Sequence, residues 1–336
     1  MKKITFACLL ACFTLLGICA GCSSNASTDH ARVHLIFDTD MAPDYDDVGA
    51  LALLHSYADE GTVEILGTIA SNQWPTAAPT IEVINTYFGR PDIPVAAVKG
   101  DGPSQTSWHK EPKWTEELPK RYPHTLKSSA DAPDALATYR QLLSQQPDQS
   151  VTIVTVGFFS NLKNLLASGP DPYSPLSGKE LVAQKVKLLV SMAGGFPEGR
   201  EFNVYIDAKA SQYIFTEWPT PIILSGFEIG DKVRTGRRLV ESGVQGSPIV
   251  DTYAMCLAQD DPAGRQSWDQ TATLVAAQGA EPFFTLVRGT MHVADDGSNT
   301  WTDDPKGQHA YLVFKKTPEE VTTFIENRMM HQPKVK

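Results

Sequence analysis

Short apolar runs that alternate with amphipathic helical patterns constrain the fold of this chain more than any other feature of its sequence. The runs predict buried strands at 33–37, 63–69, 95–97, 151–156, 186–191 and 221–224. Helical patterns fall at 48–57, 78–88, 133–145, 161–167, 208–215, 250–258, 269–278 and 317–329. Strands that alternate with helices are typical of parallel sheets with crossover helices. The sequence therefore predicts an α/β fold with a mostly parallel central sheet, flanking helices and an open doubly wound core.

The first two dozen residues have the pattern of an export signal. Lys2 and Lys3 precede an apolar stretch at 4–18, and small residues come directly before Cys22. This order is typical of a lipoprotein signal with Cys22 as the lipidation site, and an ordinary secretory peptide is the alternative. We therefore expect a lipid-anchored protein of the bacterial cell envelope, periplasmic or surface-exposed. The expected parts are a signal peptide at 1–21, a tether at 22–31 and a single domain at 32–330.

The charge of the chain excludes one class of partner, and its cysteine content excludes a disulfide within the predicted domain. The formal net charge is -10, and the longest run of basic residues is a pair. The basic stripe that binds phosphate backbones is therefore missing, and a nucleic acid polymer is excluded as a partner. Of the five cysteines, only Cys256 lies in the predicted domain, so no disulfide can form within it. Its apolar helical surroundings predict a buried thiol.

An unusually acidic segment follows the first predicted strand. Five aspartates occur within ten residues, at Asp38, Asp40, Asp44, Asp46 and Asp47. Neighbouring carboxylates raise one another's pKa values, and a hard divalent cation with oxygen ligands relieves that repulsion. A solvated acidic loop is the alternative, although ligand sites of open α/β sheets lie at this end of the strands. An EF-hand is excluded because, counted from Asp38, Pro43 holds the glycine position and Gly49 the glutamate position. Further metal ligands must come from elsewhere in the chain.

The acidic segment and several later motifs together resemble the inosine-uridine preferring nucleoside hydrolase family. The later motifs are Asn72, 154–157, 192–195, 201–203 and 268–269. Their order and approximate spacing carry the resemblance, which spans 33–324. The resemblance implies a nucleoside hydrolase-like fold and calcium-dependent hydrolysis of the N-glycosidic bond of purine or pyrimidine ribonucleosides, which yields free base and ribose for salvage.

The resemblance also implies a role for each site residue. Asp40 would be the general base, and Asn72 would orient the catalytic water or Asp40. Calcium would be bound by Asp40, Asp47, Asp269 and the main-chain carbonyl of Val156. The substrate would contact Asp46, Met192, Glu201 and Asn203, and Trp268 is a further candidate contact from its place directly before Asp269. Asp38 is expected to be a structural hydrogen-bond partner that fixes the loop.

Several of these residues also have a simpler structural interpretation. Asn72 could cap a turn. Glu201 and Asn203 could belong to an ordinary loop, and Met192 could fill the core. Asp269 could be the N-cap of the following helix, a role that is compatible with metal binding.

Three departures from the family pattern bear on the substrate. Ala42 stands where the aspartate loop usually has glycine, and the stretch 192–201 lacks an asparagine that often faces the sugar. Trp268 stands where a histidine often assists the leaving base, so the leaving-group acid is unassigned. Trp268 could stack on a base or close the pocket. Other candidate contacts are Trp74, Trp108, Tyr205 and His109, and for His109 an exposed loop position is the simplest expectation.

Two other functions remain open. One is hydrolysis of another furanosyl glycoside, which Trp268 and the missing asparagine motivate. The other is calcium-dependent sugar binding by a lipoprotein without catalysis, against which the retained Asp40 argues. Because members of the family are commonly dimers or tetramers, a homo-oligomer is implied by the resemblance alone.

Overall fold

The computed structural model describes Met1 and residues 32–334. The expected signal peptide, the lipidation candidate Cys22 and the tether up to residue 31 lie outside the described residues. From Arg32 onward the chain forms one compact unit. Among the helices of residues 32–334, none combines the length and apolar character needed to cross a membrane.

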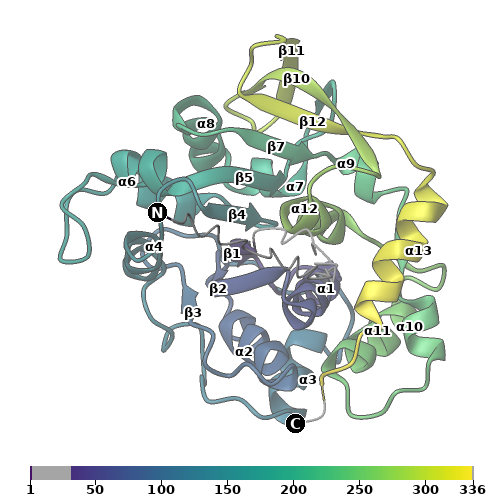
Figure 1. Ribbon diagram of the computed structural model, residues 1–336. Coiled ribbons are helices and arrows are strands. Elements are labelled where there is room, and N and C mark those ends of the chain that lie inside the picture. Colours follow the sequence, from purple (N-terminus) through teal and green to yellow (C-terminus); the bar gives the residue numbers. More distant parts are fainter. Residues whose placement is uncertain (2–31, 335–336) are drawn as a thin grey trace. The chain divides into compact units, whose positions relative to one another are not determined.

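A ten-stranded mixed sheet forms the centre of this unit, in the order β3-β2-β1-β4-β5-β7-β12-β10-β11-β6 (Figure 1). Neighbours from β3 to β12 are parallel, and β10, β11 and β6 extend the sheet as antiparallel strands. The parallel strands are β1 (Val33–Thr39), β2 (Val63–Ala70), β3 (Val95–Ala97), β4 (Val151–Thr155), β5 (Val186–Met192), β7 (Ile222–Ser225) and β12 (His309–Phe314). The antiparallel extension consists of β10 (Phe284–Val293), β11 (Asn299–Asp303) and β6 (Glu198–Gly199). A separate ribbon pairs β8 (Arg234–Thr235) with β9 (Arg265–Gln266).

Helices cover both faces of the sheet (Figure 1). One core cluster contains side chains of α1 (Asp46–Glu60), α2 (Ala77–Tyr87), α3 (Trp114–Arg121), α11 (Pro248–Gln259), α12 (Trp268–Gln278) and α13 (Pro318–Met329). The other contains side chains of α4 (Ala135–Ser144), α5 (Ser160–Ala167), α6 (Gly178–Lys185) and α8 (Ala208–Glu217). Three short helices lie in connections, namely α7 (Phe202–Ile206), α9 (Phe227–Gly230) and α10 (Arg237–Glu241).

Strand β1 shows why the predicted strands are continuous apolar runs. Leu35 and Phe37 belong to one core cluster, and Ile36 belongs to the other. Successive side chains of a strand point to opposite faces, so a strand covered by helices on both sides needs apolar residues at every position. The α/β class, the mostly parallel sheet and its flanking helices are confirmed.

The carboxyl ends of β1, β2, β4 and β5 meet at one edge, where the loops after them carry the predicted site residues. Gly157, just after β4, lets two of these loops approach closely, because an added Cβ would lie 2.3 Å from the main-chain nitrogen of Asp40. The sheet thus brings together segments that are far apart in the sequence. This is the edge where open α/β sheets place their ligands.

Candidate active site

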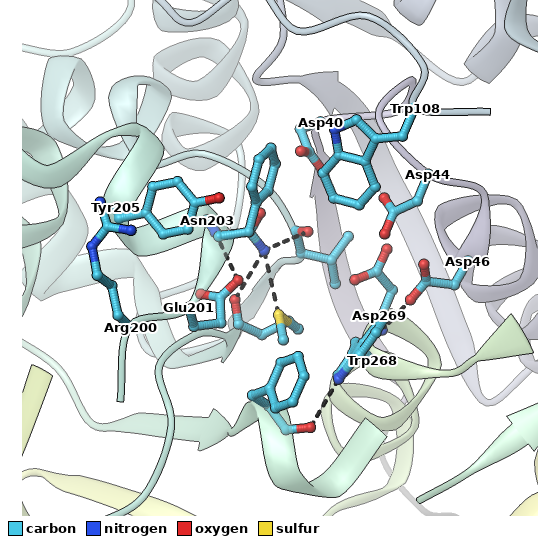
Figure 2. A pocket seen from close by; sticks show the side chains of 14 residues that line it. Asp40, Asp44, Asp46, Trp108, Arg200, Glu201, Asn203, Tyr205, Trp268 and Asp269 are labelled. Carbon is cyan, nitrogen blue, oxygen red and sulfur yellow. Dashed lines mark hydrogen bonds between the residues drawn. The ribbon is translucent and has the colours of Figure 1, made fainter. Parts of the chain in front are cut away.

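A cavity of about 380 Å³ opens beyond this edge of the sheet. Its lining falls into three groups of side chains (Figure 2). The aspartate cluster consists of Asp40, Asp44, Asp46 and Asp269. The polar floor consists of Val156, Met192, Glu201 and Asn203, all at most 5 % exposed. The aromatic rim consists of Trp108, Phe202, Tyr205, Phe227 and Trp268, with Arg200 beside it. Figure 2 shows Asp44, Asp46 and Asp269 close together, with Glu201 and Arg200 across the cavity from them.

The loop between β1 and α1 positions most of the aspartate cluster. The Thr39 hydroxyl donates to Asp47 Oδ1 and accepts a hydrogen bond of 3.1 Å from the main-chain nitrogen of Met41. Asp46 and Asp47 lie in the first turn of α1, where the positive end of the helix dipole stabilises carboxylates. The sequence Thr-Asp-Met at the end of β1 therefore connects the strand, the loop and the helix.

Asp40 lies on the cavity wall and is 3 % exposed. Burial, and then the charges of Asp47 and Asp44, raise the pKa of Asp40 well above its usual range. Asn72 holds this residue through the main chain, because its amide nitrogen donates to the Asp40 carbonyl oxygen at 2.9 Å. The Asn72 side-chain oxygen accepts from the main-chain nitrogens of Trp74 and Gln105. Asn72 thus acts on the backbone of Asp40 from behind the cavity.

Asp46 lies on the cavity wall but has both oxygens engaged by protein donors. Its Oδ2 accepts from the main-chain nitrogen of Asp269 at 3.2 Å. Its Oδ1 accepts from Nε and Nη2 of Arg265, at 3.2 and 3.0 Å. The Arg265 Nη2 also donates to Asp44 Oδ2. Arg265 was not predicted from the sequence, because a single arginine between Gly264 and Gln266 carries no motif.

The residues expected to bind a metal contribute only oxygen donors, which suit a hard cation. Asp47 lies behind the cavity lining, and its buried Oδ2 has no hydrogen-bond partner among the described residues. Burial, and then the charge of Asp46, raise the pKa of Asp47 to about 7. Burial and the neighbouring aspartates, Asp46 first, also raise the pKa of Asp269. An orphaned buried oxygen among mutually repelling carboxylates fits a site that a cation completes.

Two geometric features qualify that fit. Within residues 32–334, no group of three or more His, Cys, Asp and Glu side chains is arranged to hold a metal ion. The Val156 carbonyl accepts a hydrogen bond of 3.1 Å from the Asn203 amide. Asp269 is not the N-cap that the sequence allowed, because Ser267 holds that position and Asp269 is the second residue of α12, within its first turn.

Glu201 joins the polar floor to the start of α7. As the N-cap of that helix, its side chain accepts from the main-chain nitrogens of Asn203 at 2.7 Å and Val204 at 3.3 Å. It also accepts from Gly194 at 3.2 Å, which secures the loop after β5. Burial raises the pKa of Glu201 to about 7. The Glu-Phe-Asn triplet is therefore an ordered cap on the cavity floor rather than an ordinary loop.

Aromatic contacts organise the rim of the cavity. Trp268 Nε1 donates to the Phe227 carbonyl oxygen at 2.8 Å (Figure 2), and the two rings lie 5.2 Å apart. Trp108 meets Phe202 edge to face at 4.7 Å. Because the indole nitrogen of Trp268 is engaged by the backbone, its N–H is not free to donate a hydrogen bond to a ligand.

Two candidate contacts from the sequence lie away from the cavity. His109 is 6 % exposed, so the expectation of an exposed loop histidine is wrong. Its Nδ1 lies 3.0 Å from Asp260 Oδ2, which holds the loop against the end of α11. Trp74 lines a different cavity. Asp38 lies in β1, where its Oδ2 accepts from the Tyr139 hydroxyl and the Asn161 amide.

The fold and the cavity define an α/β protein with an acidic centre beyond the carboxyl ends of its strands. Residues 35–323 match the family described as inosine-uridine preferring nucleoside hydrolase, and the chain belongs to that family. A curated relative, the pyrimidine-specific ribonucleoside hydrolase RihA of Klebsiella pneumoniae, is 26% identical over 65% of this chain and 68% of its own length.

Solved structures show the same fold at low sequence identity. A plant nucleoside hydrolase matches with a TM-score of 0.64 and 20% identity, over 89% of this chain and 99% of its own. The inosine-uridine preferring nucleoside hydrolase of Bacillus anthracis matches with a TM-score of 0.65 and 16% identity, over the same shares. The likeness therefore extends over almost the whole described part of the chain.

Proposed function

We propose that this protein hydrolyses the N-glycosidic bond of ribonucleosides to free base and ribose. The observation that carries the proposal is Asp40, a buried carboxylate of raised pKa on the wall of a cavity that also contains Glu201 and Asn203. A carboxylate on a cavity wall can reach a bound water and accept its proton, which is the task of a general base. The family to which the chain belongs supports the same reaction class.

The chemistry follows from the charges around the cavity. As the bond from the anomeric carbon to the base nitrogen breaks, its electron pair leaves with the base and the ribose gains oxocarbenium character. Asp44, Asp46 and Asp269 stabilise that positive charge by their proximity. A water oxygen forms the new bond to the anomeric carbon, Asp40 takes the water proton, and the departing base is protonated from solvent.

We propose that Ca²⁺ completes the site, held by Asp40, Asp47, Asp269 and the Val156 carbonyl. The orphaned Asp47 Oδ2 and the all-oxygen donor set support this choice. When bound, the ion would orient the water and the ribose diol. Asp40 remains the group that receives the proton, and Asn72 holds its backbone in place.

The substrate is proposed to place its ribose on the polar floor and its base within the aromatic rim. Glu201 and Asn203 offer polar groups to the sugar, and Met192 packs beside them. Trp108, Phe227 and Trp268 offer ring faces and edges on which a planar base can stack. Trp268 supplies no titratable proton to a leaving base, which supports a second candidate, another furanosyl glycoside whose leaving group needs no protonation by this residue.

Release of reducing sugar by the domain without its first 22 residues tests the proposal. The panel contains purine and pyrimidine ribonucleosides, including the pyrimidines on which the Klebsiella relative is named to act, and 4-nitrophenyl riboside for the second candidate. Chelator-sensitive release of ribose from any nucleoside supports the proposal. Release from the riboside alone supports the second candidate, and calorimetric binding without release indicates a sugar-binding protein.

Attachment to the envelope through Cys22 is a separate proposal, with a homo-oligomer as the expected assembly. In a bacterial host, palmitate should label the full-length chain, and Cys22→Ser should lose the label. Globomycin should cause the unprocessed form to accumulate. Equal palmitate labelling of the wild type and of Cys22→Ser would contradict the lipid anchor. A monomeric mass in light scattering would contradict the homo-oligomer.

A further inference from the structure

Arg265 is a buried guanidinium in direct contact with the aspartate cluster. Its side chain is 7 % exposed, and it pairs with Asp44 and Asp46. Two nitrogens of the guanidinium, Nε and Nη2, both donate to Oδ1 of Asp46. A planar guanidinium that forks between two carboxylates holds their position as well as neutralising their charge.

The surroundings of Arg265 fix it on several sides. It lies on β9, where Thr235 of β8 is its partner in the ribbon. The guanidinium carbon lies 5.3 Å from the centre of the Tyr45 ring and 5.0 Å from that of Trp268. The Tyr45 hydroxyl is in turn held by Asp261 at 2.8 Å. Aromatic rings above a guanidinium stabilise the cation and restrict its movement.

We propose that Arg265 is a positioning residue that acts as a built-in cation for the aspartate cluster. It holds Asp44 and Asp46 on the cavity wall and compensates part of their charge, so that the loop before α1 keeps its shape without a metal ion. Removing one partner of a buried ion pair leaves an uncompensated charge, which is strongly destabilising. Asp46 also accepts from the main chain of Asp269, so the effect of Arg265 extends to the start of α12.

The same positive charge should moderate the attraction of the cluster for a divalent cation. This part of the inference rests on the proposed function, which assigns Ca²⁺ to the neighbouring carboxylates. Substitution of Arg265 should make the metal-free domain less stable and its stabilisation by Ca²⁺ larger. If Arg265 only packed against its neighbours, its substitution would lower the stability of the metal-free domain but would leave the stabilisation by Ca²⁺ unchanged.

Thermal melts in chelator at low salt provide the test. We expect Arg265→Met to lower the Tm by about 8 °C and Arg265→Lys, which keeps the charge without the fork, by about half as much. The matched control is Arg234→Met on the paired strand, whose exposed side chain donates a hydrogen bond to the Gly264 carbonyl; we expect a change of about 1 °C. A Tm for Arg265→Met equal to that of the control would overturn the proposal.

A double-mutant cycle separates charge compensation from packing. Asp44→Asn should be tolerated better in the Arg265→Met background than in the wild type, because it removes the uncompensated carboxylate. Additive losses in the cycle would contradict the proposal. Titration with CaCl₂ should then raise the Tm of Arg265→Met more than that of the wild type, and equal shifts would refute the moderating role. Because the cycle needs neither turnover nor calcium, it decides on Arg265 even where the proposed function fails.

Discussion

The aspartate cluster and the aromatic rim share one cavity but are built differently. The cluster residues are held by the backbone, by one another and by Arg265, and Asp40 and Asp46 are almost fully buried. The rim includes side chains that face solvent, since Trp108 is 53% exposed and Phe227 47%. Under the proposed function, the buried cluster contains the charges that would act on the sugar, and the exposed rim contains the surfaces that would meet the leaving group. The comparison then predicts that the cluster sets the reaction and the rim sets the choice of base.

Removal of divalent cations should produce the largest effect on the cluster side of this comparison. We expect a calcium chelator to lower turnover of the best nucleoside by about 100-fold or more, because the orienting cation would be lost. Added Ca²⁺ should restore the rate, and the same treatment should leave folding intact in circular dichroism. Full turnover in the presence of chelator would show that the reaction needs no divalent cation.

Truncation of Trp268 should have an intermediate effect on the rim side. We expect Trp268→Ala to lower kcat/KM by about tenfold, the loss that corresponds to one aromatic stacking contact. The matched control is Trp268→Phe, which keeps a ring at the site without the indole nitrogen and should retain most of the activity. If the two variants lost activity equally, the bond to Phe227 rather than stacking would be the important contact.

Trp108→Ala should have a smaller effect, since this residue is the most exposed of the rim. A loss of about threefold in kcat/KM, mainly through KM and unequal between purines and pyrimidines, is expected for a partly solvated stacking contact. Identical losses for all bases would show that Trp108 takes no part in base choice.

Glu201 offers a test that depends on pH rather than on turnover. Its pKa is about 7 in the folded protein against an ordinary value of 4.5, so the folded state binds the proton more tightly between these values. Its contribution to stability is therefore fully present below about pH 4.5 and is lost as the pH rises through about 7. Relative to Glu201→Gln, the wild type should lose at most about 3 kcal/mol of unfolding free energy across this interval. If the difference in unfolding free energy between the wild type and Glu201→Gln stayed constant from pH 4 to pH 8, the raised pKa of Glu201 would be contradicted.

The sequence predicted the parts of the fold that repeat a simple pattern. The six strands at 33–224 are apolar at nearly every position because helices cover both faces of the sheet. The antiparallel strand β10 was missed because it carries exposed residues such as Leu286 and Arg288 beside buried ones. Short helices such as α7 and α9 were missed because they are too brief to show a helical period.

The residues of the candidate site likewise divide into those that a local sequence pattern indicated and those that it did not. The five aspartates were recognised because their density after a buried strand is itself unusual. The positions of Arg265 and of the buried His109 depend on contacts with Asp46 and Asp260, more than 100 positions away in the sequence, so no local pattern could indicate them. The capping role of Glu201 depends on where α7 begins, which the sequence did not predict.

The most direct test of the central claim compares ribose release by the wild type and by Asp40→Asn under identical conditions with Ca²⁺. Asparagine preserves the size of the side chain and the contact between Asn72 and the main chain, but it cannot take a proton from water. We expect kcat to fall by about two or more orders of magnitude with little change in KM. A variant that releases ribose at close to the wild-type rate would contradict Asp40 as the general base and with it the proposed mechanism.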